Sequence, residues 1–205
     1  MSIIDDYDIL KGLTEAVSEN ENENENKEPF PTIDTERFNA YIQSPADIPE
    51  DVLYQLVDLV EGKYDINPEK PQIDVSAPKT IDRLLNSQTI IYITEDNIPV
   101  GMVNIIDPTI KNFQDIIPLD IYSLQSGTNL NGRLQQEFFS VADEYADMGI
   151  AQELKAQINA LDIPTFTVVD ETDTKTIKGL AKNGYQFVST FQPTLNDVPV
   201  QLWID

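Results

Sequence analysis

The segment from Glu137 to Ile158, EFFSVADEYADMGIAQELKAQI, constrains the chain most, because it has the pattern of a strand, a tight loop and a helix in succession. Its first five residues are largely aromatic or β-branched, as in a strand within a sheet. Ile150, Leu154 and Ile158 follow at intervals of four and form one apolar stripe of a helix. Gly149 lies where the loop turns into that helix.

This loop combines a backbone suited to an anion with side chains that oppose one. A glycine-bearing loop before a helix presents unpaired N–H groups and the positive end of the helix dipole, which favour a phosphate. Asp143, Glu144 and Asp147 nevertheless surround it, and no Lys or Arg lies between Arg133 and Lys155. How these opposite features are reconciled is the main functional question of the chain.

Composition excludes several kinds of site. The 205 residues include no Cys and no His, which excludes disulfides, thiol nucleophiles, ordinary zinc sites and Ser-His-Asp triads. With 36 acidic and 13 basic residues the formal net charge is −23, which opposes binding to nucleic acid or to an anionic membrane. No run of about 18 apolar residues exists, and Asp5, Asp6 and Asp8 stand where a signal peptide would be positive. We therefore expect a soluble cytoplasmic protein.

The N-terminal part differs from the rest of the chain. Residues 1–17 carry apolar side chains at roughly helical spacing, which predicts a short amphipathic helix. Residues 18–36 begin with alternating Glu and Asn and predict a disordered acidic tether. Two interpretations stay open: the helix folds back on its own domain, or Met1–Val17 docks on a protein partner that the tether lets the domain reach.

Residues 37–205 are predicted to form one domain. Pro108, Pro118 and Gly127 interrupt residues 107–131, so a long loop is expected there, with a short strand at 121–124. The order of elements predicts an α/β (α+β) mixed sheet with helices on both faces. We predict further strands at 38–43, 89–94, 100–106, 137–141, 165–169, 185–191 and 200–204, and helices at 50–60, around 81–85, at 150–158 and at 174–183.

Two motifs in this order resemble those of the GNAT superfamily of acetyl-CoA-dependent N-acetyltransferases. VADEYADMGIAQEL, from Val141 to Leu154, is similar to the family's V-x-P-E-Y-R-G-K-G-I-G-x-x-L. TVVDETDTKTIKGLAKNGYQFV, from Thr167 to Val188, is similar to T-V-x-x-x-N-x-x-A-I-x-L-Y-x-K-x-G-F-x-x-V. The resemblance covers roughly residues 37–204 and implies a GNAT-like acyl-CoA N-acyltransferase fold around a central twisted sheet.

The resemblance also implies a site for acetyl-CoA. In the family, loop amides hold the pyrophosphate and strand amides pair with the pantetheine arm. Ala146 stands where the family has Arg or Gln, and the acidic side chains of the loop should weaken binding by about 1–2 kcal/mol. The implied cofactor-binding residues are Phe139 and Val141 on the strand and Asp147, Met148, Gly149, Ile150 and Ala151 on the loop.

The residues that would perform the chemistry match the family less closely. The family's general acid, a Tyr on the last helix, falls on Leu180, which cannot donate a proton, and the preceding Asn falls on Asp173. Tyr145 is a substitute acid whose position is usually packed in the fold. Glu137 is the nearest candidate general base, and the alternative is an exposed carboxylate at the start of a strand.

Two functions follow from these observations. The first is transfer of an acetyl group from acetyl-CoA to an amine, with a cationic substrate attracted by the acidic protein. The second is a catalytically inactive GNAT-fold module that binds a partner and is tethered through Met1–Val17 to a larger assembly, such as a virus particle. Fold alone does not decide between them.

Overall fold

The computed structural model describes residues 32–64, 76–109, 119–192 and 199–205. The helix predicted at 1–17, and the tether as far as residue 31, lie outside the described residues. No helix of the described part is long and apolar enough to cross a membrane. No group of three or more acidic side chains in that part could hold a metal ion.

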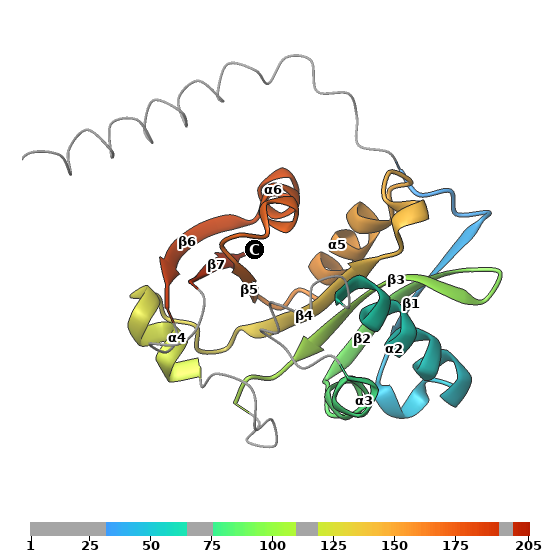
Figure 1. Ribbon diagram of the computed structural model, residues 1–205, viewed down its shortest axis with the longest axis horizontal. Coiled ribbons are helices and arrows are strands. Elements are labelled where there is room, and N and C mark those ends of the chain that lie inside the picture. Colours follow the sequence, from blue (N-terminus) through green and yellow to red (C-terminus); the bar gives the residue numbers. More distant parts are fainter. Residues whose placement is uncertain (1–31, 65–75, 110–118, 193–198) are drawn as a thin grey trace, which may run out of the picture. The chain divides into compact units, whose positions relative to one another are not determined.

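A mixed sheet of seven strands forms the centre of the domain (Figure 1). The strands run in the order β1-β2-β3-β4-β5-β7-β6, and every neighbouring pair is antiparallel except β4 and β5. This architecture confirms the predicted mixed sheet. The bounds are β1 (Phe38–Gln43), β2 (Thr89–Glu95), β3 (Ile98–Ile106), β4 (Leu134–Val141), β5 (Thr165–Asp170), β6 (Gln186–Phe191) and β7 (Val200–Ile204).

Helices cover both faces of this sheet, as predicted. They are α2 (Glu50–Tyr64), α3 (Ala77–Leu85), α4 (Leu119–Ser126), α5 (Ile150–Ala160) and α6 (Thr174–Lys182), with short 3-10 turns η1 (Pro45–Asp47) and η2 (Asp143–Tyr145). α2 and α3 place Leu56 and Leu84 against Met102 and Phe138 on one face. α5 places its apolar stripe on the opposite face.

The strand predicted at 121–124 is wrong, because these residues lie within α4. A short apolar run is compatible with either a strand or a helix, and periodicity does not separate the two over so few residues. Tertiary packing stabilises the helix here: the Tyr122 ring packs edge-on against Phe166 and Phe191 at centroid distances of 6.0 and 5.8 Å.

The start of α5 lies unusually close to the sheet. Gly101 on β3 has no side chain, and a Cβ built there would come within 2.5 Å of Ile150 Cγ2 and 3.5 Å of Leu154 Cδ1. The glycine therefore sets how closely the N-terminus of α5 approaches β3. This matters because the loop that feeds α5 carries most of the implied cofactor-binding residues.

Gly101→Ala should lower the free energy of unfolding by roughly 1–3 kcal/mol, because the added methyl overlaps Ile150. Gly62→Ala on α2 is the matched control, since a Cβ there meets nothing within 4 Å. Alanine is favoured over glycine inside a helix by about 0.5–1 kcal/mol, so the control should be stabilised. Urea unfolding measures both, and equal midpoints would contradict the close packing of α5.

Candidate functional site

The two parallel strands β4 and β5 lie together over only part of their length. Their pairing covers three residue pairs and ends at Gln136↔Thr167. Beyond it, β4 continues to Val141 beside β3, and β5 continues to Asp170 beside β7 (Figure 1). The strands therefore part at their carboxyl ends. Ligands of α/β sheets bind outside such ends, and we call this space the β4–β5 opening.

A β-bulge bends β4 where the opening begins. Asn104 pairs with Glu137 and Met102 pairs with Ser140, so one residue of β3 faces two residues of β4. Phe138, inside the bulge, has a φ of 51°, which a bulky side chain rarely adopts. Bulges recur beside active sites because they redirect side chains and end strand pairing. Here the bulge separates the paired half of β4 from the half that faces the opening.

Backbone groups of β4 after the bulge point into the opening. Ala142 N donates to Val100 O of β3 at 2.9 Å. Along a strand, the N–H and C=O groups of alternate residues point to opposite sides. Phe139 and Val141 therefore direct their backbone groups away from β3. They are the two strand residues that the family resemblance implies for the pantetheine arm.

The loop after β4 ends at a helix N-terminus that no side chain caps. Gly149 is the N-cap residue of α5 and has φ 81° and ψ 1°, the left-handed region that glycine adopts without steric cost. Ile150 is buried against the sheet and anchors the first turn, while Asp147 and Met148 are exposed. The first-turn N–H groups of α5, including that of Ala151, are thus presented at the opening.

The acidic side chains of the loop lie at the surface. Asp143, Glu144 and Asp147 are all exposed. Lys175 Nζ of α6 lies 3.9 Å from Asp143 Oδ1, and the two side chains are 77% and 72% exposed. Solvent weakens such a pair, so it leaves most of the negative charge of the loop in place.

Glu137 is a buried, ion-paired residue, and the alternative of an exposed carboxylate is wrong. Arg83 Nη1 on α3 lies 3.2 Å from each carboxylate oxygen, and Gln135 Nε2 donates to Oε1 at 3.2 Å. Burial raises the pKa of the Glu137 carboxyl, and the Arg83 guanidinium opposes that rise. The error arose because β4 begins at Leu134, so Glu137 lies inside the strand and not at its start.

Several buried polar groups surround Glu137 on β3 and β4. Both amide atoms of Asn104, Gln135 Oε1 and Ser140 Oγ are buried and have no hydrogen-bond partner in the described part of the chain. Asn104 is the direct cross-strand neighbour of Glu137. Unpaired buried groups of this kind can hold a water or a polar group of a ligand. Sequence reasoning missed both Asn104, in an apolar strand, and Arg83, in an amphipathic helix, because neither lies in a motif.

The two other residues considered as acids have structural contacts. Tyr145 Oη donates to Glu95 Oε2 at 2.6 Å, and this hydrogen bond raises the pKa of Tyr145. Leu180, at the family's tyrosine position, is buried beside Trp203. Asp173 caps α6 by accepting a hydrogen bond from Thr176 N at 3.0 Å. Neither Tyr145 nor Leu180 thus offers a proton in the opening.

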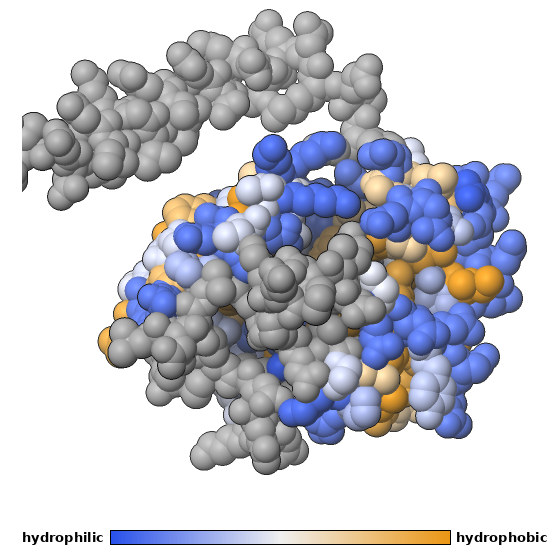
Figure 2. Space-filling model, viewed as in Figure 1, coloured by the Kyte–Doolittle hydropathy of each residue, from blue (hydrophilic) through white to orange (hydrophobic). Residues whose placement is uncertain are grey.

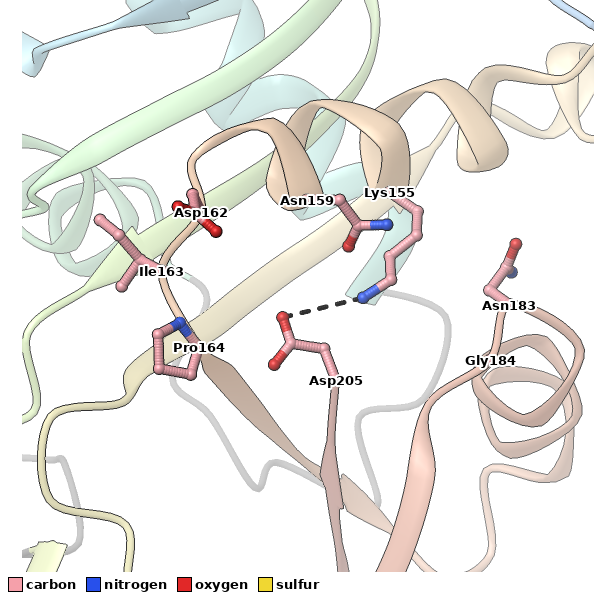
Figure 3. A pocket seen from close by; sticks show the side chains of 8 residues that line it. All are labelled: Lys155, Asn159, Asp162, Ile163, Pro164, Asn183, Gly184 and Asp205. Atoms are coloured by element: carbon pink, nitrogen blue, oxygen red, sulfur yellow. Dashed lines mark ion pairs between the residues drawn. The ribbon is translucent and has the colours of Figure 1, made fainter.

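A hollow of about 520 Å³ lies near the other end of α5 (Figure 3). Lys155 Nζ lies 3.7 Å from the centroid of the Tyr185 ring and 3.9 Å from Asp205 Oδ2, so its charge is already engaged. Burial lowers the pKa of Lys155, and Asp205 opposes this. The hollow shares no residue with the implied cofactor-binding set. Its lining residues are Lys155, Asn159, Asp162, Ile163, Pro164, Asn183, Gly184 and Asp205.

Comparisons with known proteins identify the fold. An acetyltransferase of the GNAT family from Streptococcus agalactiae is 17% identical, with 81% of this chain and 94% of that chain covered and a TM-score of 0.61. A putative GNAT-family acetyltransferase from Desulfovibrio desulfuricans is 12% identical, covering 82% and 98%, with a TM-score of 0.57. The AHL synthase LasI is 16% identical, covering 82% and 89%, with a TM-score of 0.55.

In sequence comparisons, no protein-family model and no curated protein matches this chain. Structural likeness at such low identity establishes the fold alone. The chain has the GNAT acyl-CoA N-acyltransferase fold, as the two motifs implied.

Arg83→Met should lower the free energy of unfolding by about 3–5 kcal/mol, because it leaves the Glu137 carboxylate buried without its partner. Burial already raises the pKa of this carboxyl. A carboxyl whose pKa is raised by folding destabilises the protein when ionised, so the loss should shrink from about pH 7 to about pH 5. Urea unfolding of variant and wild type at both pH values measures this difference.

The double variant Arg83→Met/Glu137→Leu is the control for that experiment. Replacing both partners by apolar side chains removes the unpaired charge, so most of the lost stability should return. A double variant as unstable as Arg83→Met would show that Arg83 stabilises the domain by packing and not through Glu137.

Proposed function

We propose that this chain binds acetyl-CoA in the β4–β5 opening and transfers its acetyl group to an amine. The observation that carries this proposal is the backbone of the opening. The bulge at Phe138, the outward groups of Phe139 and Val141, and the left-handed Gly149 before α5 provide N–H groups along one path. Because these groups belong to the main chain, the atypical side chains of the loop do not remove them.

The proposed binding residues are those that the resemblance implies. The backbone of Phe139 and Val141 would pair with the pantetheine arm, and the amides of residues 147–151 would hold the pyrophosphate at the positive end of α5. Bound there, acetyl-CoA supplies an acyl group activated as a thioester. Strand N–H groups near its carbonyl oxygen would stabilise the negative charge that develops when an amine attacks.

The chain offers a route for the amine proton but none of the usual donors for the leaving group. We assign the amine proton to a water held by Asn104 and Ser140, with Glu137 behind it as the acceptor. Burial raises the pKa of the Glu137 carboxyl and so makes its carboxylate a stronger base, and the pairing with Arg83 opposes part of this gain. Leu180 replaces the acid that would protonate the thiolate, so slow turnover is expected.

The acceptor proposed is a cationic amine. A net charge of −23 attracts cations to the protein and raises their local concentration at clefts. The same charge opposes binding to nucleic acid, and we propose a location in the cytoplasm.

A GNAT-fold module without turnover is the second candidate. Three observations favour it: Leu180 is buried at the acid position, Arg83 pairs with Glu137, and the loop is acidic. In this case the domain would serve a larger assembly, such as a virus particle, through a protein partner of Met1–Val17 and the tether at 18–36. The two candidates differ in whether acetyl-CoA binds and reacts.

Calorimetric titration of acetyl-CoA should show binding, and Ala146→Arg/Met148→Lys should tighten it by about 1–3 kcal/mol through charge-assisted hydrogen bonds. Asn39→Arg/Ala40→Lys is the matched control, because it adds the same charge at exposed positions of β1. Gly149→Glu should abolish binding, since it places a strained acidic residue at the start of α5. Turnover is then measured with a panel of amines by the rate at which free CoA thiol appears.

Binding without thiol release would favour the module over the enzyme. An absence of heat, in a protein whose circular dichroism shows an intact fold, would rule out both the cofactor and acetyl transfer. Equal gains in the two charge-adding variants would show that only net charge matters and that the loop is not at the phosphates.

A variant that begins at Phe30 tests the tether. If Met1–Val17 docks on a partner, the shortened chain should keep its melting temperature and lose the partner in a pull-down. A fall of several degrees in the melting temperature would instead place the N-terminal helix on its own domain, since about 1 kcal/mol shifts a domain of this size by roughly 2–4 °C.

A further inference from the structure

α6 is a basic element in a strongly acidic protein. It carries Lys175, Lys178 and Lys182 and no acidic residue, whereas the whole chain has 13 basic residues against 36 acidic ones. These lysines, at i, i+3 and i+7, lie on one side of the helix. Ile177 and Leu180 occupy the other side and pack toward Trp203. The lysine side therefore faces solvent.

The first turn of α6 lies across the opening from the acidic loop. α6 follows β5, and the loop follows β4, so the two segments leave the sheet from the two strands that part. The 3.9 Å approach of Lys175 Nζ to Asp143 Oδ1 joins them. Figure 2 shows hydrophilic side chains gathered along this edge, where Figure 1 places α6 and the loop before α5.

This arrangement can offset the repulsion between the carboxylates of the loop and a bound phosphate. Asp143, Glu144 and Asp147 repel a phosphorylated ligand, and the loop has no cation of its own. We propose that Lys175, assisted by Lys178, binds the phosphate groups of the CoA nucleotide from the α6 side of the opening. The inference rests on the proposed function, because it names residues for the same ligand.

The existing contact of Lys175 does not prevent this role. The pair with Asp143 is long and mostly exposed, so it is weak. A phosphate carries more charge than a carboxylate and offers more acceptor oxygens, so it competes well for the same ammonium group. Lys175 would then turn from Asp143 to the ligand when the ligand binds. Asp143 is thereby a competitor of the phosphate for Lys175.

Charge reversal on α6 tests the proposal by titration of acetyl-CoA into the full chain. Lys175→Glu should weaken binding about tenfold and Lys178→Glu about threefold, with both effects shrinking as salt is added. Lys182→Glu is the matched control: it makes the same change in net charge about 10 Å farther along the helix, and binding should change less than twofold. Asp143→Asn should tighten binding about threefold.

A loss of binding by Lys175→Glu would not reflect unfolding. A glutamate in the first turn of a helix interacts favourably with the helix dipole, and this side chain is 77% exposed. A parallel titration with 3′-dephospho-CoA separates the two phosphate sources. If Lys175→Glu raises the dissociation constant of 3′-dephospho-CoA as much as that of acetyl-CoA, Lys175 binds the pyrophosphate. If it leaves the dissociation constant of 3′-dephospho-CoA unchanged, Lys175 binds the 3′-phosphate. Both results support the proposal.

Two results would overturn it. If acetyl-CoA binds and the three lysine variants weaken binding equally, the effect is one of net charge, and the proposed function survives without this assignment. If acetyl-CoA does not bind the wild-type chain at all, the proposed function and the role of α6 fall together.

Discussion

The parting of β4 from β5 is the constraint on which the rest of this structure depends. Parallel pairing stops at Gln136↔Thr167, and a bulge at Phe138 turns the remaining half of β4. Without a neighbour on that side, strand amides need a ligand, water or solvent as partner, since buried unpaired N–H groups are costly. The close packing of Ile150 on Gly101 then holds the start of α5 beside the same space. The strained backbone of Phe138 and the absence of a side chain at Gly101 thus shape the space together.

The bulge leaves Glu137 and Phe138 on the same face of the sheet, the one that α2 and α3 cover. On this face the Glu137 carboxylate pairs with Arg83. Burying a charge pair costs desolvation energy, so the pair is weak evidence for stability. The presence of Glu137 and Arg83 in the core therefore needs a reason other than stability. The amide of Asn104 and the hydroxyl of Ser140, which are buried and unpaired in the described part of the chain, supply one, because they add polar groups beside this pair.

Most of the fold could be predicted from the sequence, and most of the side-chain chemistry could not. The strand-loop-helix around Gly149 has strong periodicity and a glycine in the conformation that glycine favours, so local preference and final structure agree. α4 was missed because its short apolar segment suits a strand equally well. Arg83 and Asn104 were missed because their roles arise from cross-strand and helix–sheet contacts, which leave no local pattern. The binding residues that the resemblance implies remain predictions.

The proposed site consists of main-chain groups, so it depends on the fold, which this chain shares with structures that are only 12–17% identical to it. Any sequence that keeps the bulge, the parting strands and the left-handed glycine presents the same amides, whatever its side chains are. Side chains are therefore free to change the strength of phosphate binding and the speed of proton transfer. In this chain the loop is acidic and α6 carries lysines, so in the proposed site the positive charge that a phosphate requires comes from α6, across the opening from the loop.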